Sequence, residues 1–307
     1  MARFEYLEAR TLRQAVTLAQ RHGAEARIVA GSTDFLVRWR LGTWTPRWVI
    51  NIEHIPGLRR ITYNPRSGLR LGALVTIRSL ETHPAIRLRY SALSAAASSF
   101  AGVQVRNLAT VGGNVCNASP AGDTLPALLA FDASCRLVGP EGERWVPLGR
   151  FFTGPGRTVL QAGEVLAGLQ LPPTGPGTGS LYIKHSPRGA MDIATLGVAA
   201  MVRLRDGGSV CGEVRIALGA VASTPIRAYA AEDLLRGGPL TEALVEAAAR
   251  QAQSTARPID DLRGSAEYRR AMIGVLTKRT LERAIEAARS GPMPFELQRS
   301  LATGAAF

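Results

Sequence analysis

A glycine-rich segment in the first half of the chain constrains the fold most. Residues Thr110 to Asn114 read Thr-Val-Gly-Gly-Asn, and residues Ala118 to Asp123 read Ala-Ser-Pro-Ala-Gly-Asp. Paired glycines let the backbone approach a ligand closely and supply amide donors that no side chain shields. An apolar, helix-like run from Leu125 to Phe131 follows. We therefore predict a loop, held between packed elements, that suits the pyrophosphate of a dinucleotide.

A second candidate phosphate-binding loop lies near the N-terminus. Residues 27–30 read as a short buried strand, and a helical stretch begins near Phe35, with Gly-Ser-Thr-Asp between them. A strand, turn and helix in this order direct free amides at a phosphate, and Ser32 or Thr33 could cap the helix. Two such loops in one chain favour a long ligand that carries two phosphates.

The composition restricts the class of protein. The 307 residues, 46% of them hydrophobic, suffice for a buried core and for two or three domains. No apolar run has the length of a membrane span, and the first residues do not resemble an export signal. Cys116, Cys135 and Cys211 are too few and too far apart for a metal or iron–sulfur site. We expect a cytoplasmic protein with reduced thiols and no metal site of its own.

The net charge of +13 raises the question of nucleic-acid binding. Of the 37 basic residues only Lys184 and Lys278 are lysines, and the arginines are scattered along the whole chain. No dense basic block with interleaved aromatic residues is present, which argues against a nucleic-acid partner. An anionic ligand or an acidic partner subunit accounts for the charge equally well.

Hydrophobic patterning predicts an α+β chain. A β-α-β unit ends near residue 56, and a hairpin turns at residues 64–68. Residues 172–179, rich in proline and glycine, mark a domain boundary. Beyond it we expect strands at 181–185, 192–205 and 210–218, then helices at 225–235, 241–254 and 266–289. The predicted domains are residues 1–175, with subdomains of about 1–56 and 57–175, and 178–290, followed by an irregular tail at 291–307.

These motifs, in this order, resemble one known family over nearly the whole chain. The family's two pyrophosphate motifs stand here as residues 30–34 and 110–114, and further similar segments stand at 118–123, 156–166, 182–192 and 261–270. The chain is similar to the FAD-binding (medium) subunit of molybdenum hydroxylases of the carbon monoxide dehydrogenase and xanthine dehydrogenase type. One departure is Ser32, which replaces the second glycine of the family's Ala-Gly-Gly, and serine tolerates a positive φ poorly.

The resemblance implies both a fold and a function. The fold would be a two-part FAD-binding domain of the vanillyl-alcohol-oxidase-like (PCMH) type. A C-terminal domain like that of the CO dehydrogenase flavoprotein would follow, with a three-stranded antiparallel sheet and a helical bundle. The chain would carry electrons from iron–sulfur clusters to an external acceptor. Its partners would be a large molybdenum-cofactor subunit and a small iron–sulfur subunit with [2Fe-2S] clusters, in a dimer of heterotrimers.

The resemblance also implies which residues contact FAD, and it assigns no catalytic side chain. The implied contacts are Ala30, Gly31, Ser32, Thr33, Asp34, Thr76, Phe100, Thr110, Val111, Gly112, Gly113, Asn114, Ser119, Asp123, Leu166, Tyr182 and Lys184. The ammonium of Lys184 would lie near the isoalloxazine and stabilise the reduced flavin, although it could also be a solvated strand lysine. Asp123 could bind a flavin hydroxyl or begin a helix. Phe100 and Tyr182 could equally be core residues.

Two other functions stay open on the residues alone. A self-contained FAD oxidase of the vanillyl-alcohol-oxidase-like superfamily would need its own substrate pocket, and a flavin-free scaffold subunit has only Ser32 in its favour. A Rossmann dehydrogenase is excluded because no Gly-x-Gly-x-x-Gly follows a strand. A hydrolase is poorly supported, because neither Gly-x-Ser-x-Gly nor a pair of catalytic carboxylates is present.

Overall fold

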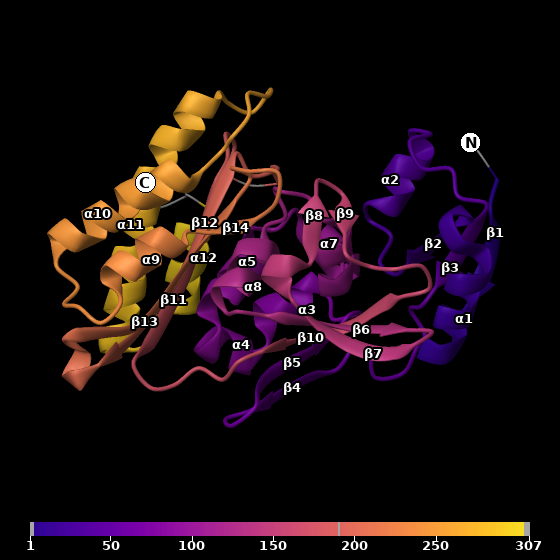
Figure 1. Ribbon diagram of the computed structural model, residues 1–307, viewed down its shortest axis with the longest axis horizontal. Coiled ribbons are helices and arrows are strands. Elements are labelled where there is room, and N and C mark those ends of the chain that lie inside the picture. Colours follow the sequence, from indigo (N-terminus) through magenta and orange to yellow (C-terminus); the bar gives the residue numbers. More distant parts are fainter. Residues whose placement is uncertain (1–2, 190, 304–307) are drawn as a thin grey trace.

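The computed structural model describes residues 3–189 and 191–303. The chain begins with a small α/β unit, drawn in indigo in Figure 1, in which three parallel strands lie in the order β1-β3-β2. Its elements are β1 (Glu5–Glu8), α1 (Leu12–His22), η1 (Gly23–Glu25), β2 (Ala26–Val29), α2 (Phe35–Arg40) and β3 (Trp48–Asn51). Helix α1 forms because its apolar residues recur at helical spacing and because the Thr11 side chain accepts a hydrogen bond from the amide of Gln14. The predicted β-α-β unit is therefore present.

The second unit is a five-stranded antiparallel sheet with strand order β4-β5-β10-β6-β7. Its strands are β4 (Ile61–Asn64), β5 (Gly68–Gly72), β6 (Ser134–Gly139), β7 (Gly142–Pro147) and β10 (Val165–Leu171), and a hairpin of β8 (Phe152–Gly154) and β9 (Arg157–Thr158) follows η2 (Leu148–Arg150). The central strand β10 is buried on both faces. Leu166 belongs to the main core, whereas Val165 and Ala167 pack with α1 in a second core. The sheet therefore joins the first unit to the rest of the molecule.

Helices between β5 and β6 form the layer that carries the second glycine motif. They are α3 (Ile77–Thr82), α4 (Pro84–Arg89), α5 (Ser91–Ser99), α6 (Val103–Leu108), α7 (Val111–Asn117) and α8 (Thr124–Ala130). Helices α4 and α5 are separate elements, because Tyr90 between them leaves the helical conformation and its buried hydroxyl donates to Pro172 O at 2.8 Å. The predicted loop at residues 110–114 is wrong, because helix α7 starts at Val111.

The C-terminal domain is a four-stranded antiparallel sheet covered by helices. The strands are β11 (Thr178–His185), β12 (Leu196–Arg205), β13 (Val210–Gly219) and β14 (Ile226–Arg227), with η3 (Asp206–Gly208) between β12 and β13. The helices are α9 (Tyr229–Leu235), α10 (Glu242–Thr255), α11 (Ala266–Ser290) and α12 (Phe295–Ala302). The sheet has one strand more than predicted, because β14 forms where the helix at 225–235 was expected to begin.

The tail predicted to be irregular contains α12, whose Leu301 and Ala302 are buried and which packs against α5. Residues 304–307 of that predicted tail lie outside the described residues. None of the helices in residues 3–189 and 191–303 is long and apolar enough to cross a bilayer.

Helices α5 and α8 lie between the two large sheets in Figure 1 and join the domains. Helix α8 packs against β12 and β13, and α5 packs against β11. Ser91 Oγ donates to Ser180 O at 2.7 Å, and the Ala92 amide donates to Ser180 Oγ at 3.1 Å. A single hydrophobic core runs from β5 through these helices into the C-terminal sheet. Segments from both sides of the linker are therefore packed together around α5.

Candidate functional site

The fold brings the two predicted phosphate loops together. Gly31, which follows β2, lies directly against the main chain of Leu108 at the end of α6, and a Cβ atom on Gly31 would stand 1.8 Å from Leu108 O. No residue but glycine fits this approach. The side chain of Asn117, in α7, bridges the same two segments. Its amide donates to Asp34 Oδ1 at 3.2 Å, and its carbonyl accepts from Arg38 Nη2 at 3.1 Å.

The first loop offers free main-chain donors. Across the described residues, the amides of Gly31, Ser32, Thr33 and Asp34 donate to no protein acceptor. Ser32 adopts φ +55°, the left-handed conformation for which the family's glycine is suited, and its Oγ donates to Ala30 O at 2.9 Å. The predicted helix cap is wrong: Asp34 occupies the cap position of α2, and no side chain accepts a hydrogen bond there. Successive unshielded amides of this kind suit an anion.

The second motif uses its amides internally. The Val111 amide donates to Val75 O and the Gly112 amide to Ala73 O, each at 2.9 Å. The Gly113 amide donates to Thr110 Oγ1 at 3.1 Å, since Thr110 caps α7. The prediction that this motif presents free amide donors is therefore wrong for the structure described here.

The two glycines of the second motif have different surroundings. A Cβ on Gly112 would lie 2.6 Å from Ala73 O, so Gly112 permits close packing of α7 on the strand end. Gly113 is exposed, and only Thr110 Oγ1 lies within 4 Å of its hypothetical Cβ. Asn114 is buried and accepts a hydrogen bond of 2.6 Å from the Thr124 hydroxyl. Gly112 and Asn114 are thus packed inside the protein, and Gly113 is the residue of the pair of glycines that is open to a ligand.

Among the remaining predicted residues, Thr76 lies beside the second motif. Thr76 forms a short antiparallel bridge with Thr110 and caps α3 through its hydroxyl. Phe100 is half-buried against the main core, and Leu166 is buried within it. Ser119 is half-buried, and its hydroxyl accepts from the Ala121 amide at 3.3 Å.

Asp123, Tyr182 and Lys184 form one buried cluster. Asp123 Oδ1 accepts from the Tyr182 hydroxyl at 3.0 Å, and Oδ2 accepts from Lys184 Nζ at 2.9 Å. Lys184 is 4% exposed, and Nζ also donates to Ser99 O at 3.1 Å and to Asp192 O at 2.7 Å. The alternative of a solvated strand lysine is therefore wrong.

The electrostatics of this cluster follow from its burial. Burial raises the pKa of the Asp123 carboxyl, and the Lys184 ammonium and the Tyr182 hydroxyl oppose that shift. Burial, together with the Asp123 charge, raises the pKa of Tyr182 well above its ordinary value. Tyr182 is packed so tightly that a Cβ on Gly197 would lie 2.5 Å from its hydroxyl. This agrees with the alternative that Tyr182 is a core residue.

Sequence reasoning missed Asn117 and the buried arginine Arg106. Arg106 Nε donates to Glu81 Oε2 at 3.0 Å, and both side chains are buried. An arginine in the short helix α6, which also holds two valines and a leucine, was a usable signal, because an arginine is almost never buried without a partner. Asn117 gave no such signal, because its role depends on the approach of α2.

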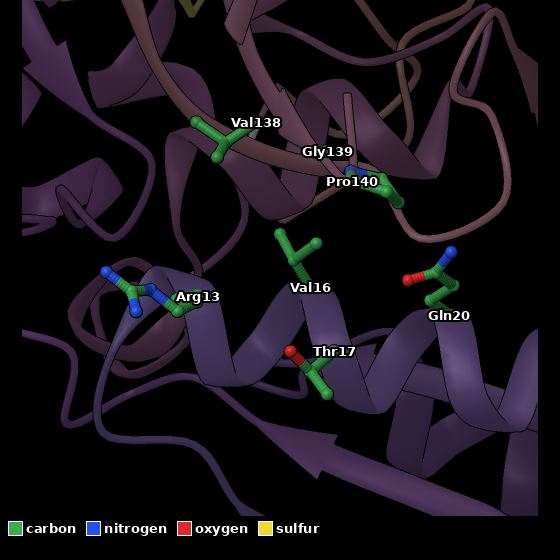
Figure 2. Close-up of a pocket in the computed structure, with 7 residues that line it drawn as sticks. All are labelled: Arg13, Val16, Thr17, Gln20, Val138, Gly139 and Pro140. Atoms are coloured by element: carbon green, nitrogen blue, oxygen red, sulfur yellow. The ribbon is translucent and has the colours of Figure 1, made fainter. Parts of the chain in front are cut away.

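The groove drawn in Figure 2 belongs to a different part of the molecule. It measures about 320 Å³ and lies between α1 and the β6–β7 turn. Its lining residues are Arg13, Val16, Thr17, Gln20, Val138, Gly139 and Pro140. None of them is a predicted site residue. No group of three His, Cys, Asp or Glu side chains suited to a metal occurs among the described residues.

Two family profiles match consecutive parts of the chain. A FAD binding domain in molybdopterin dehydrogenase matches residues 2–174, and a CO dehydrogenase flavoprotein C-terminal domain matches residues 182–284. The chain belongs to the FAD-binding subunits of the molybdenum hydroxylase family. The FAD cofactor, the α+β fold class and the oxidoreductase class predicted from the sequence are therefore confirmed.

Relatives of known name match most of this FAD-binding subunit. A putative xanthine dehydrogenase FAD-binding subunit of Escherichia coli K12 is 36% identical, covering 92% of this chain and 96% of the relative. The carbon monoxide dehydrogenase medium chain of Hydrogenophaga pseudoflava is 36% identical, covering 92% and 97%. A solved structure of the carbon monoxide dehydrogenase from that organism superposes with a TM-score of 0.88, at 36% identity and the same coverage.

The residues present fit FAD. The first loop has unpaired amides within the described residues, and the second motif has an exposed glycine, Gly113, whose hypothetical Cβ would meet only Thr110 Oγ1. These features match the needs of a pyrophosphate held close to backbone. Which of the predicted residues contact the cofactor stays a prediction.

Proposed function

We propose that this chain is the FAD-carrying electron-transfer subunit of a heterotrimeric molybdenum hydroxylase. It would receive electrons from iron–sulfur clusters of a small partner subunit and pass them to an external acceptor. Substrate would be hydroxylated on a large molybdenum-cofactor subunit. The observation that carries the proposal is the meeting of two loops from separate units, with Gly31 against Leu108, in a chain that matches 97% of the length of a carbon monoxide dehydrogenase medium chain.

The residues would hold FAD in distinct ways. The free amides of residues 31–34 would donate to the pyrophosphate oxygens, and the open surface of Gly113 would admit the ligand close to the backbone. Asp123 could accept one further hydroxyl donor, because within the described residues each of its carboxylate oxygens accepts one hydrogen bond and can accept two. When bound, FAD supplies the reversible electron acceptance that amino-acid side chains lack.

The rest of the cluster would orient the cofactor and would not react with it. All three N–H groups of the Lys184 ammonium are engaged by protein acceptors, so Lys184 would influence the flavin only through space. Its charge is opposed at 2.9 Å by Asp123, which reduces that influence further.

The two alternative functions have less support. Relatives that match 96% or 97% of their own length to this chain are named as subunits or as a medium chain, which favours a subunit over a self-contained oxidase. The flavin-free scaffold was suggested only by Ser32, and that residue adopts the left-handed conformation required at its position.

An electron-transfer measurement tests the proposal. The FAD-loaded chain is mixed without oxygen with its small iron–sulfur subunit, which has been reduced beforehand, and the long-wavelength flavin absorption is followed. We expect the two chains to form a complex and the flavin band to bleach. A flavin that stays oxidised in that mixture, in a chain that oxidises an organic substrate unaided, would instead establish the oxidase.

We further propose that the complex is a cytoplasmic dimer of heterotrimers. The three cysteines are free thiols, which suits a reducing compartment. Sedimentation of the assembled complex measures its stoichiometry, and a single heterotrimer would contradict the dimeric arrangement.

A further inference from the structure

Three consecutive main-chain carbonyls at the end of α5 are each held by a buried cation. Lys184 Nζ donates to Ser99 O at 3.1 Å, and Arg106 Nη1 donates to Phe100 O and to Ala101 O, each at 2.9 Å. Carbonyls at a helix C-terminus lack partners within the helix, and a positive charge there is favourable. We call residues 99–102 the carbonyl turn.

Each of the two cations is bound in turn by a buried carboxylate from another element. Glu81, in α3, accepts from Arg106 Nε at 3.0 Å and is also paired with Arg78 at 2.8 Å. Asp123, before α8, accepts from Lys184. Arg106 is 7% exposed and Glu81 is 2% exposed, so neither belongs to a solvated surface pair.

The carbonyl turn has a conformation that would not persist alone. Ala101 has φ +38°, a region that residues other than glycine rarely adopt. Such residues persist where the surroundings determine the backbone, and they cluster at ligand sites. The hydrogen bonds from Arg106 to the carbonyls of Phe100 and Ala101 fix the turn on both sides of this strained residue.

The turn also adjoins the predicted FAD residues. It contains Phe100, and the ammonium that holds Ser99 holds Asp123 and the carbonyl of Asp192 as well. A Cβ on Gly102 would lie 3.5 Å from Met191 Sδ, so the turn and the segment after β11 are neighbours. A displaced turn would therefore displace several candidate contacts together.

We propose that Arg106 is a positioning residue that sets the carbonyl turn in the conformation to which FAD binds. The proposal rests on the proposed FAD-carrying function and explains how its site is preassembled. A buried ion pair seldom contributes more stability than apolar residues of similar volume would. The benefit of Arg106 is therefore geometric: its planar guanidinium donates from two separate nitrogens held in a fixed plane, Nη1 to the two consecutive carbonyls and Nε to Glu81, whereas an ammonium donates from a single nitrogen that rotates freely.

A matched pair of substitutions tests this proposal. Arg106→Lys removes the guanidinium that donates to the two carbonyls of the carbonyl turn but keeps a positive charge beside Glu81. Arg227→Lys is the control, because the Arg227 side chain is as little exposed as that of Arg106, 9% in each, and is bound at 2.6 Å to the fully buried Glu232 in the C-terminal domain. We expect the FAD dissociation constant to rise about tenfold or more in the first variant and less than about twofold in the second. The visible circular dichroism of the bound flavin should change only in the first.

A rescue variant separates positioning from general stability. Ala101→Gly makes the left-handed conformation accessible without strain, so Arg106→Lys combined with Ala101→Gly should recover part of the lost FAD affinity. Wild-type affinity and an unchanged flavin spectrum in Arg106→Lys would overturn the proposal. So would equal weakening in Arg227→Lys, or an Arg106→Lys chain that fails to fold while Arg227→Lys folds. Failure of the wild-type chain to bind FAD would refute the proposed function instead.

Discussion

Replacing each of the two adjacent glycines of the second motif by alanine should affect a different property: stability at Gly112 and FAD affinity at Gly113. In Gly112→Ala the new Cβ would lie 2.6 Å from Ala73 O and 2.7 Å from Ala73 Cβ, whereas ordinary contacts begin near 3.4 Å. Helix α7 must then move away from Ala73, and the 2.9 Å hydrogen bond from the Gly112 amide is lost or stretched. In Gly113→Ala the new Cβ meets only Thr110 Oγ1, at 2.9 Å, and otherwise faces open space.

The expected magnitudes follow from these contacts. Overpacking costs about 1–3 kcal/mol, and a lost hydrogen bond costs about 1 kcal/mol. Replacing a helical glycine by alanine returns about 0.5–1 kcal/mol. Gly112→Ala should therefore lower the free energy of unfolding by about 1–3 kcal/mol, and Gly113→Ala should change it by less than about 1 kcal/mol.

The FAD affinity should change in Gly113→Ala, the variant whose free energy of unfolding changes less. Gly113→Ala places a methyl group on the open surface where we expect the cofactor to approach, so its FAD dissociation constant should rise. Urea unfolding of the apoprotein and FAD titration measure the two quantities separately. Gly238→Ala serves as the control, because nothing lies within 4 Å of its hypothetical Cβ. Gly113→Ala with wild-type affinity for FAD would refute the account of this motif.

Three further predictions follow from the cluster, the first loop and the histidines. Lys184→Met leaves the buried Asp123 without its cation and should lower the free energy of unfolding in urea by about 3–5 kcal/mol. Adding Asp123→Asn should recover much of that loss, and a double variant no more stable than Lys184→Met would contradict the pairing. Ser32→Gly should retain FAD and change the free energy of unfolding by less than about 1 kcal/mol, because a strained φ and one hydroxyl bond are lost together; loss of FAD in this variant would show that the hydroxyl is required. Burial lowers the pKa of His185, so the folded state binds its proton less readily than the unfolded state does. The free energy of unfolding should then be highest above the ordinary histidine pKa of about 6.5 and decline as pH falls below it. Unfolding measured from pH 7 to 5 should show a shallower decline in His185→Gln. An unchanged slope would show that His185 is not the source of the pH dependence.

The parts of this fold that the sequence predicted are those governed by local pattern. Helix α1 follows from apolar residues at helical spacing, and the start of α11 follows from Ser265, whose side chain caps it. The family motifs predicted FAD because their glycines mark positions where backbone must approach backbone or ligand. These signals needed no knowledge of the tertiary structure.

The parts that the sequence did not predict depend on contacts between distant segments. Which glycine motif keeps free amides is decided by Val75 and Ala73, whose carbonyls bind the amides of the second motif. The break between α4 and α5 depends on the Tyr90 hydroxyl reaching Pro172 in the linker. Helix α12 forms within a predicted irregular tail because α5 offers it a surface on which to bury Leu301. No local pattern carries this information.

The central claim is that this chain binds FAD between two loops and uses it to carry electrons. The most direct test is the visible absorption spectrum of the purified chain, taken before and after heat release of the bound cofactor. The account predicts a two-band flavin spectrum and FAD released in stoichiometric amount. A colourless chain that cannot be reconstituted with FAD would contradict it.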